Sequence, residues 1–341
     1  MKKIRILTLI IATLLTFSLC SCIFQPEDTD GAQNPTANTT ANTTANTTAS
    51  TTTTPATTET DTNGDVITSA TEDTTVEPDT NLPGSEEIVE ITASLHFSSK
   101  GCEISDTSTV MVSGKIYKIV KAGTYRISGT MEDGQIQVEV GDSDKVTLLL
   151  DNFDGKCSDS AVIYVINADK AYIDLEKGSV NTLTDATIYK FANPADDKPN
   201  ACIYSADDLT IKGGGRLNVY ANYNNGIGCK NDIDIKNGSI SVKAVKNAIK
   251  GNDSVTVRGD AEVVITGAKD GIKTDNLEES GKGFVSITET AKVVVTCSDD
   301  AIQATQNVII TEDASVTVVA ASSAVNCDGD TNIADSSLII Q

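Results

Sequence analysis

The feature that most constrains the fold is a repeat of about 23 residues in the second half of the chain. Each unit aligns on one branched aliphatic residue, and consecutive anchors are 24, 22, 23, 30 and 23 residues apart. A period in this range indicates a solenoid, in which each unit buries its apolar side chains against its neighbours. The anchors are Ile203, Ile227, Ile249, Ile272, Ile302 and Val325.

Each unit contains short apolar runs separated by a turn, as in "IDIKNGSISVKA" (233–244) and "VTVRGDAEVVITGA" (255–268). The runs alternate and are rich in β-branched residues, which is typical of strands, and no useful helical period is present. The sequence therefore predicts an all-β parallel β-helix of about ten coils, stacked about 4.8 Å apart. A β-sandwich is the alternative, but it would not need matching turn residues in every unit.

Two columns of the aligned repeat hold small residues, which indicates tight turns with little room for side chains. Cys202, Cys229 and Cys327 fall in these columns and are therefore expected to be small buried residues with free thiols. The six cysteines after residue 22 show no CxxC spacing, which argues against a zinc site. The columns are Cys202, Gly226, Ala248, Gly271, Ala301, Ala324 and Ser205, Cys229, Gly251, Thr274, Ala304, Cys327.

The first 88 residues differ in composition from the repeat region. Residues 1–21 have a basic start and a short apolar run, as in an export signal, and "LCSC" resembles a bacterial lipobox that would make Cys22 the lipidated N-terminus. An ordinary cleaved signal is the alternative. Residues 22–88 are rich in Thr, Ala and Asn, which predicts a disordered tether. We thus expect residues 89–341 to form the folded domain, on the outer face of the cytoplasmic membrane or the cell surface.

The formal net charge of −22 limits the partners of the chain. Nucleic acids and anionic lipid surfaces would be repelled, so contact with a membrane is expected through the lipid anchor only. An acidic surface favours bound cations instead. We expect a monomer.

Several segments in order resemble a family of bacterial extracellular lipoproteins described as carbohydrate-binding domain-containing proteins. They include "KAGTYRISGTMEDGQIQVEVGDSDKVTLLLDN" (121–152), "PNACIYSADDLTIKGGGRLNVYANYNNGI" (199–227) and the repeated "DGIK"-like turns. The family is typified by a clostridial β-helix that binds cellulose and polygalacturonate and carries calcium. The resemblance implies a right-handed, pectate-lyase-like β-helix with calcium at stacked turns. Family nine polysaccharide lyases look similar, and there a lysine acts as the base.

Oxygen-bearing side chains recur two and three residues before the anchors. Stacked carboxylates repel one another and need a cation or a shared proton, and calcium supplies this with six to eight oxygen ligands. The alternative is neutralisation by lysine, because Lys246 and Lys269 stand in the same ladder. The predicted calcium ligands are Asn247, Asp270, Asp299 and Asp300.

The chain has no tryptophan, so tyrosines are the candidates for stacking on sugar rings. Three of them fall within one coil beside two asparagines, whose amides would bind hydroxyl groups. Packing in the core or at an edge is the alternative. The predicted carbohydrate-binding residues are Tyr204, Tyr220, Tyr223, Asn222 and Asn224.

Catalytic chemistry is poorly supported. The one histidine, His96, precedes the repeat, which excludes histidine-based triads. Calcium-assisted β-elimination with Lys250 or Lys273 as base is the enzymatic alternative, but a lysine beside acids is held charged. We therefore expect a surface-anchored, non-catalytic protein that binds cellulose or acidic pectic glycans. The remaining alternative is a structural or adhesive spacer.

Overall fold

The computed structural model describes residues 89–341 except 192, 194, 196–197 and 321. The predicted signal (1–21), the lipidated Cys22 and the tether (22–88) lie outside the described residues. No helix in the described part of the chain is long and apolar enough to cross a bilayer.

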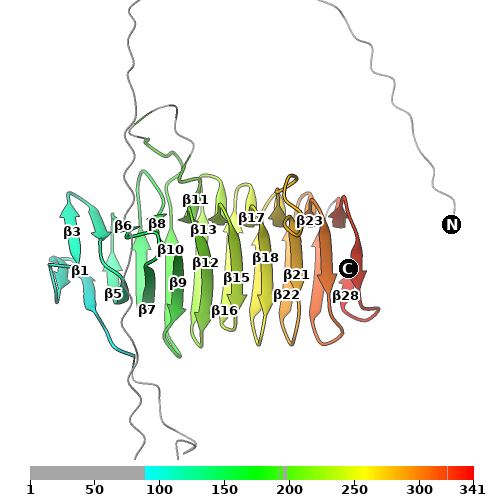
Figure 1. The fold of residues 1–341 in the computed structure, drawn as a ribbon, viewed down its shortest axis with the longest axis horizontal. Coiled ribbons are helices and arrows are strands. Elements are labelled where there is room, and N and C mark those ends of the chain that lie inside the picture. The colour runs from blue at the N-terminus through cyan, green and yellow to red at the C-terminus, as the bar shows by residue number, and fades with distance from the viewer. Residues whose placement is uncertain (1–88, 192, 194, 196–197, 321) are drawn as a thin grey trace, which may run out of the picture. The chain divides into compact units, whose positions relative to one another are not determined.

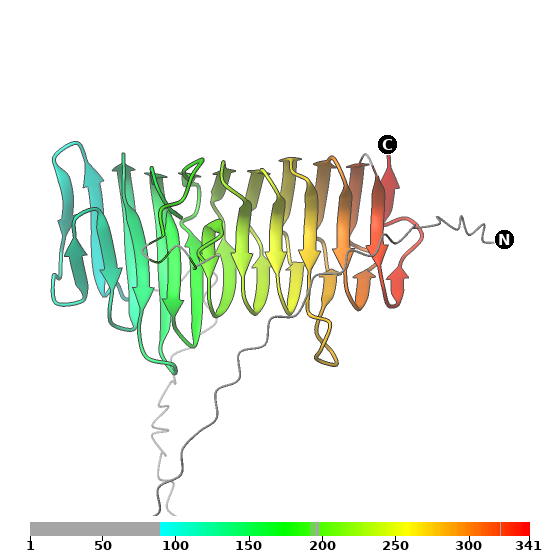
Figure 2. The same ribbon diagram turned by 90° about the horizontal axis from the view of Figure 1, so that it is seen from above.

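The described residues form a parallel β-helix, which confirms the predicted fold class (Figure 1). Its coils follow one another along the long axis, as the view from above also shows (Figure 2). In the repeat region each coil contributes three short strands, one to each of three columns. Strands of one column pair with the next coil in parallel, and only the pairs β1–β2 and β3–β4 near the N-terminus are antiparallel.

The first column consists of ten strands and is called the ten-stranded sheet below. Its strands are β3 (Val110–Ser113), β4 (Ile116–Ile119), β6 (Gln135–Glu139), β8 (Ile163–Asn167), β11 (Ala201–Ser205), β14 (Asn225–Cys229), β17 (Asn247–Gly251), β20 (Asp270–Thr274), β23 (Asp300–Ala304) and β26 (Ser323–Cys327).

The second column begins with an antiparallel pair and continues through nine further strands. Its strands are β1 (Ala93–Ser98), β2 (Gly101–Ile104), β5 (Gly123–Met131), β7 (Lys145–Lys156), β9 (Lys170–Leu175), β12 (Asp208–Gly213), β15 (Asp232–Lys236), β18 (Ser254–Arg258), β21 (Phe284–Ile287), β24 (Asn307–Ile310) and β27 (Thr331–Ile333).

The third column starts where the long strand β7 bends and pairs with both β9 and β10. Its strands are β10 (Val180–Thr184), β13 (Arg216–Ala221), β16 (Ser239–Ala244), β19 (Glu262–Gly267), β22 (Lys292–Cys297), β25 (Ser315–Ala320) and β28 (Leu338–Ile340).

The anchors of the repeat stack in register through the ten-stranded sheet, so that each isoleucine pairs with that of the next coil. Ile203, Ile227, Ile249, Ile272 and Ile302 are fully buried. Burying a side chain of this size stabilises the fold by roughly 1.5–3 kcal/mol. The long step of the repeat is a loop between β20 and β21, where the insertion 276–283 was expected.

The small-residue column next to the anchors is explained by close approach of consecutive coils. A Cβ atom on Gly271 would lie 2.3 Å from the carbonyl oxygen of Ala301 in the next coil. All six cysteines of the described region are free thiols, including the three predicted to be so. Cys202 and Cys229 are buried as predicted, but Cys327, in the last coil of the ten-stranded sheet, is only half-buried.

Candidate functional site

One row of side chains crosses the outer face of the ten-stranded sheet, parallel to the axis of the solenoid. It is formed by the residue that follows the inward-facing anchor in each strand, and consecutive members pair in register. Its members, called the outer row here, are Lys118, Gln137, Tyr164, Tyr204, Gly228, Lys250, Lys273, Gln303 and Asn326. The row therefore presents amide, aromatic and ammonium groups at a spacing of about 4.8 Å, one per coil.

The aromatic part of the row is a pair of tyrosines. Tyr164 and Tyr204 pair in register, and their rings meet edge to face with centroids 5.8 Å apart. Tyr204 is only 4% exposed, whereas Tyr164 is half-buried. Of the two, Tyr164 offers more of its ring to a ligand.

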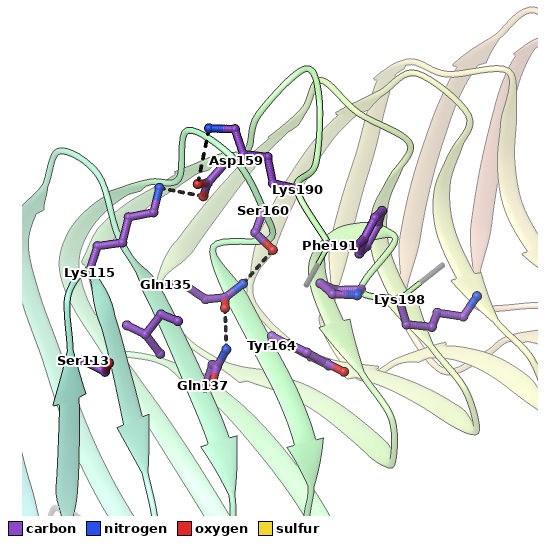
Figure 3. Close-up of a pocket in the computed structure, with 12 residues that line it drawn as sticks. Ser113, Lys115, Gln135, Gln137, Asp159, Ser160, Tyr164, Lys190, Phe191 and Lys198 are labelled. Carbon is purple, nitrogen blue, oxygen red and sulfur yellow. Dashed lines mark hydrogen bonds and ion pairs between the residues drawn. The ribbon is translucent and has the colours of Figure 1, made fainter. Parts of the chain in front are cut away.

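A pocket of about 380 Å³ lies on the outer face beside Tyr164 (Figure 3). On its floor, the amide of Gln137 donates a hydrogen bond of 2.6 Å to Gln135, and the Gln135 amide donates one of 2.9 Å to Ser160. This chain of bonds holds the glutamine side chains in one orientation. At the rim, Asp159 lies between two lysines, Lys115 at 2.6 Å and Lys190 at 4.0 Å.

A second pocket of about 260 Å³ opens where the outer row has no side chain, at Gly228. Tyr204 and Lys250, the neighbours of Gly228 in the row, border it on either side. Lys198 lines both pockets, so the two hollows follow one another along the same face.

Further toward the C-terminus, three predicted calcium ligands come together. Asp270, Asp299 and Asp300 each place a carboxylate oxygen within 4.8 Å of the others. Asp270 is 1% exposed, although Lys269 and Lys273 each lie 3.6 Å from one of its oxygens.

Lys269 also contacts Asp299 at 2.9 Å. This hydrogen bond raises the pKa of Lys269 and lowers the pKa of Asp299. Lys269, which stands in the predicted ladder of oxygen-bearing side chains, therefore neutralises part of the negative charge of that ladder.

The fourth predicted ligand, Asn247, lies one coil earlier, in register with Asp270. Its side-chain nitrogen donates to Asn225 at 2.7 Å, but its Oδ1 is buried and has no hydrogen-bond partner among the described residues. Oδ1 of Asp270 is buried and unbonded in the same way. Unsatisfied buried oxygens are costly, so the donor set fits a hard cation such as calcium.

The remaining predicted sugar-binding residues lie away from the outer row. Tyr220 is 46% exposed on β13 in the third column. Tyr223 is stacked on Tyr189, with ring centroids 4.1 Å apart. Asn222 and Asn224 sit at the corner between β13 and β14, and the side chain of Asn222 donates to the backbone oxygen of Asp185. The structure therefore separates the five residues instead of gathering them.

The sequence did not single out Asp185, whose carboxyl group is buried. It is 4% exposed and accepts hydrogen bonds from the Tyr189 hydroxyl at 2.7 Å and from the Asn222 backbone amide at 2.5 Å. Burial raises its pKa to about 6, although these hydrogen bonds act in the opposite direction. Asp185 precedes the segment that carries Lys190, Phe191 and Lys198 to the first pocket.

The two lysines considered as catalytic bases are neighbours in the outer row. Lys250 pairs with Lys273 in register, and each forms an ion pair, Lys250 with Asp275 and Lys273 with Asp270. Neither lysine lies as an isolated amine in an apolar pocket, which is the usual environment of a lysine that acts as a catalytic base.

The fold is a parallel β-helix that carries a row of polar and aromatic side chains on one outer face. A solved polysaccharide lyase-like protein from C. thermocellum, a gadolinium derivative, matches it with a TM-score of 0.71 and 43% identity. The match covers 74% of this chain and 100% of that chain.

The family follows from the sequence comparisons. The family model of carbohydrate-binding domain-containing proteins matches residues 113–339. A carbohydrate-binding domain-containing protein of Acetivibrio thermocellus is 43% identical over 249 residues, which are 73% of this chain and 86% of the relative. The chain belongs to the family of carbohydrate-binding domain-containing proteins, as the resemblance of its repeats indicated.

Proposed function

We propose that the protein is a non-catalytic polysaccharide-binding protein that holds an extended glycan along the outer row. The observation that carries this proposal is the in-register succession of amide, tyrosine and lysine side chains on one face of the ten-stranded sheet. Coils about 4.8 Å apart offer one contact for roughly each sugar ring of an extended chain. Cellulose and acidic pectic glycans such as polygalacturonate are the proposed ligands.

The experiment is binding of the full chain to insoluble cellulose and to polygalacturonate. Tyr164→Ala should weaken binding, because each stacked ring contributes contact area and C–H contacts to the sugar face. Tyr172→Ala is the matched control, since Tyr172 belongs to the second column and contacts Lys170 and Lys212 there. Equal binding by both variants would contradict this placement, and no binding by the wild type would favour a structural spacer.

Tyr220 provides a second aromatic candidate because almost half of its surface is exposed. Tyr220→Ala, tested in the same assay, compares the third column with the outer row. Reduced binding by this variant and unchanged binding by Tyr164→Ala would move the site to the third column.

We include a calcium ion in the proposal, bound by Asp270, Asp299 and Asp300 with Asn247. Calcium would neutralise the carboxylates and bind the turns of adjacent coils together. The two buried oxygens without a hydrogen bond, Oδ1 of Asn247 and Oδ1 of Asp270, and the cluster of carboxylates support it.

Calcium binding is tested by titration calorimetry and by the thermal midpoint with and without a chelator. Asp270→Asn should remove the calcium-dependent rise in the midpoint, and Asp313→Asn, an exposed carboxylate in a distant turn, should keep it. A midpoint of the wild type that does not respond to calcium would refute the site.

A calcium-dependent lyase is the alternative, favoured by the description of the structural relative as lyase-like. It predicts release of unsaturated products from polygalacturonate, followed by their ultraviolet absorbance, and loss of the signal in Lys273→Ala. Binding without product release is the outcome that our proposal requires.

We also propose that Cys22 carries a lipid that anchors the chain at the cell surface, and that the chain is a monomer. Cys22→Ala should release the protein into the medium. Sedimentation of the soluble variant measures its oligomeric state.

A further inference from the structure

The pocket at Gly228 contrasts in charge with the rest of the molecule. The chain has a net charge of −22, yet this pocket is lined by Lys198, Lys230 and Lys250 and by no carboxylate among the described residues. Lys230 is exposed and has no ion-pair partner within the part of the chain that the structure describes, whereas Lys250 forms an ion pair with Asp275. A local concentration of ammonium groups on an acidic protein favours an anionic ligand.

A glycine is required at position 228 because the coils pack closely there. A Cβ atom at this position would lie 2.9 Å from the Ala201 Cβ and 3.3 Å from Cδ2 of the Tyr204 ring. Gly228 therefore adds no side chain to the outer row, and the pocket lies between the Tyr204 ring and Lys250.

Amide groups complete the lining of the pocket. Asn200, Asn225 and Asn252 all border it. The Asn225 side chain is 2% exposed and held in place, since its nitrogen donates to the backbone oxygen of Asn200 at 3.1 Å and its Oδ1 accepts from Asn247 at 2.7 Å. The wall is thus rigid and polar, which is typical of a site that fixes the orientation of its ligand.

The volume of about 260 Å³ limits what the pocket can hold. It lies below the usual range of pockets for drug-sized ligands, which is roughly 300–1,000 Å³. One sugar ring with its carboxylate fits this size class better than an oligosaccharide does. The next members of the row, Lys250 and Lys273, are each ion-paired with an aspartate, so Lys230 is the ammonium group left for an anionic ligand.

We propose that the Gly228 pocket is a subsite that selects a uronic acid residue within the bound glycan, with Lys230 binding its carboxylate. This inference rests on the proposed function, because it assigns the ligand chemistry of one position on the outer row. Tyr204 and the asparagine amides border the sugar ring.

The test compares three soluble ligands by titration calorimetry on the full chain: oligogalacturonate, its methyl ester and a cello-oligosaccharide. Lys230→Gln should lower the affinity for oligogalacturonate about tenfold, since it removes one charge-assisted contact. The affinity for the two neutral ligands should not change. Lys236→Gln is the matched control, because Lys236 is an exposed lysine of the second column.

Gly228→Ser presses a side chain against Ala201 and Tyr204 at the pocket and should weaken binding of oligogalacturonate further than Lys230→Gln does. Its fold is checked by circular dichroism, and Lys230→Gln decides the question if the serine variant does not fold. The subsite is refuted if Lys230→Gln binds oligogalacturonate as tightly as Lys236→Gln does, or loses affinity equally for all three ligands. A wild type that binds none of the ligands would instead refute the proposed function itself.

Discussion

Replacing Asp185 by asparagine isolates the effect of one buried carboxyl group on the stability of the β-helix. In the folded chain this group is almost completely buried and contacts the Tyr189 hydroxyl and the Asn222 amide. Tyr189 also lies 3.0 Å from the backbone oxygen of Ala201 and has only one proton to donate. An asparagine at 185 can donate its own proton to the Tyr189 oxygen, so the hydrogen bonds survive the exchange.

The sign and size of the effect follow from the pKa of Asp185. It is raised from a usual value of 3.8 to about 6 by burial. Between about pH 4 and 6, the folded chain therefore keeps a proton on Asp185 that the unfolded chain releases. The stabilisation by the protonated carboxyl group is fully present below about pH 4 and is lost as the pH rises through about 6. At 1.36 kcal/mol per pH unit, the loss is on the order of 2 to 3 kcal/mol.

The assay is urea unfolding of wild type and Asp185→Asn at pH 4, 5, 6 and 7, followed by far-ultraviolet circular dichroism. The asparagine variant should gain about 2 to 3 kcal/mol relative to the wild type between pH 4 and 7. Other carboxylates cancel in this difference because both proteins carry them. Asp313→Asn is the exposed control. A difference between Asp185→Asn and wild type that stays constant over this pH range would refute the reasoning.

Three further predictions concern packing, the acidic cluster and the thiols. Gly271→Ala should destabilise the chain by about 1–3 kcal/mol in urea unfolding because the new Cβ meets a backbone carbonyl of the next coil. Gly267→Ala should cost less than about 0.5 kcal/mol, since the nearest atom lies 4.0 Å away, and equal losses would contradict this explanation. Lys269→Gln should raise calcium affinity in titration calorimetry because it removes a competing ammonium group; reduced affinity would show that the lysine supports the site. Cys327 should react with a thiol reagent in the native protein before Cys202, whose pKa is raised by complete burial; equal rates would mean that the coils open together.

The parts of the molecule that repeat were predictable from the sequence. A period of about 23 residues determines which side chains stack, so the buried anchors and the meeting of Asp270 with Asp299 and Asp300 followed from alignment alone. In a parallel solenoid the pairing register equals the repeat register, and this equivalence converts columns of sequence into neighbours in space.

The parts outside the repeat were not predictable in this way. Nearness in sequence grouped Tyr223 and Asn222 with Tyr204, but the corner between β13 and β14 turns them toward Tyr189 and Asp185. Tyr189 and Asp185 come from a segment that has no equivalent in the other coils, so the aligned repeat does not identify them as partners. The basic pocket was missed for a related reason, because Lys198 reaches it from the same segment.

The outer row has a consequence for the length of glycan that the protein can hold. Its contacts are spaced by backbone hydrogen bonds between coils, about 4.8 Å apart, and this spacing cannot adjust to the ligand. A sugar chain has a repeat distance of its own, so any difference between the two repeat distances adds up from coil to coil until the sugar rings no longer face the side chains of the outer row. Affinity should therefore rise with oligosaccharide length over the first few sugars and then reach a plateau. The oligosaccharide length at which the affinity stops rising would therefore measure how closely the strand spacing of the β-helix matches the repeat distance of the sugar chain.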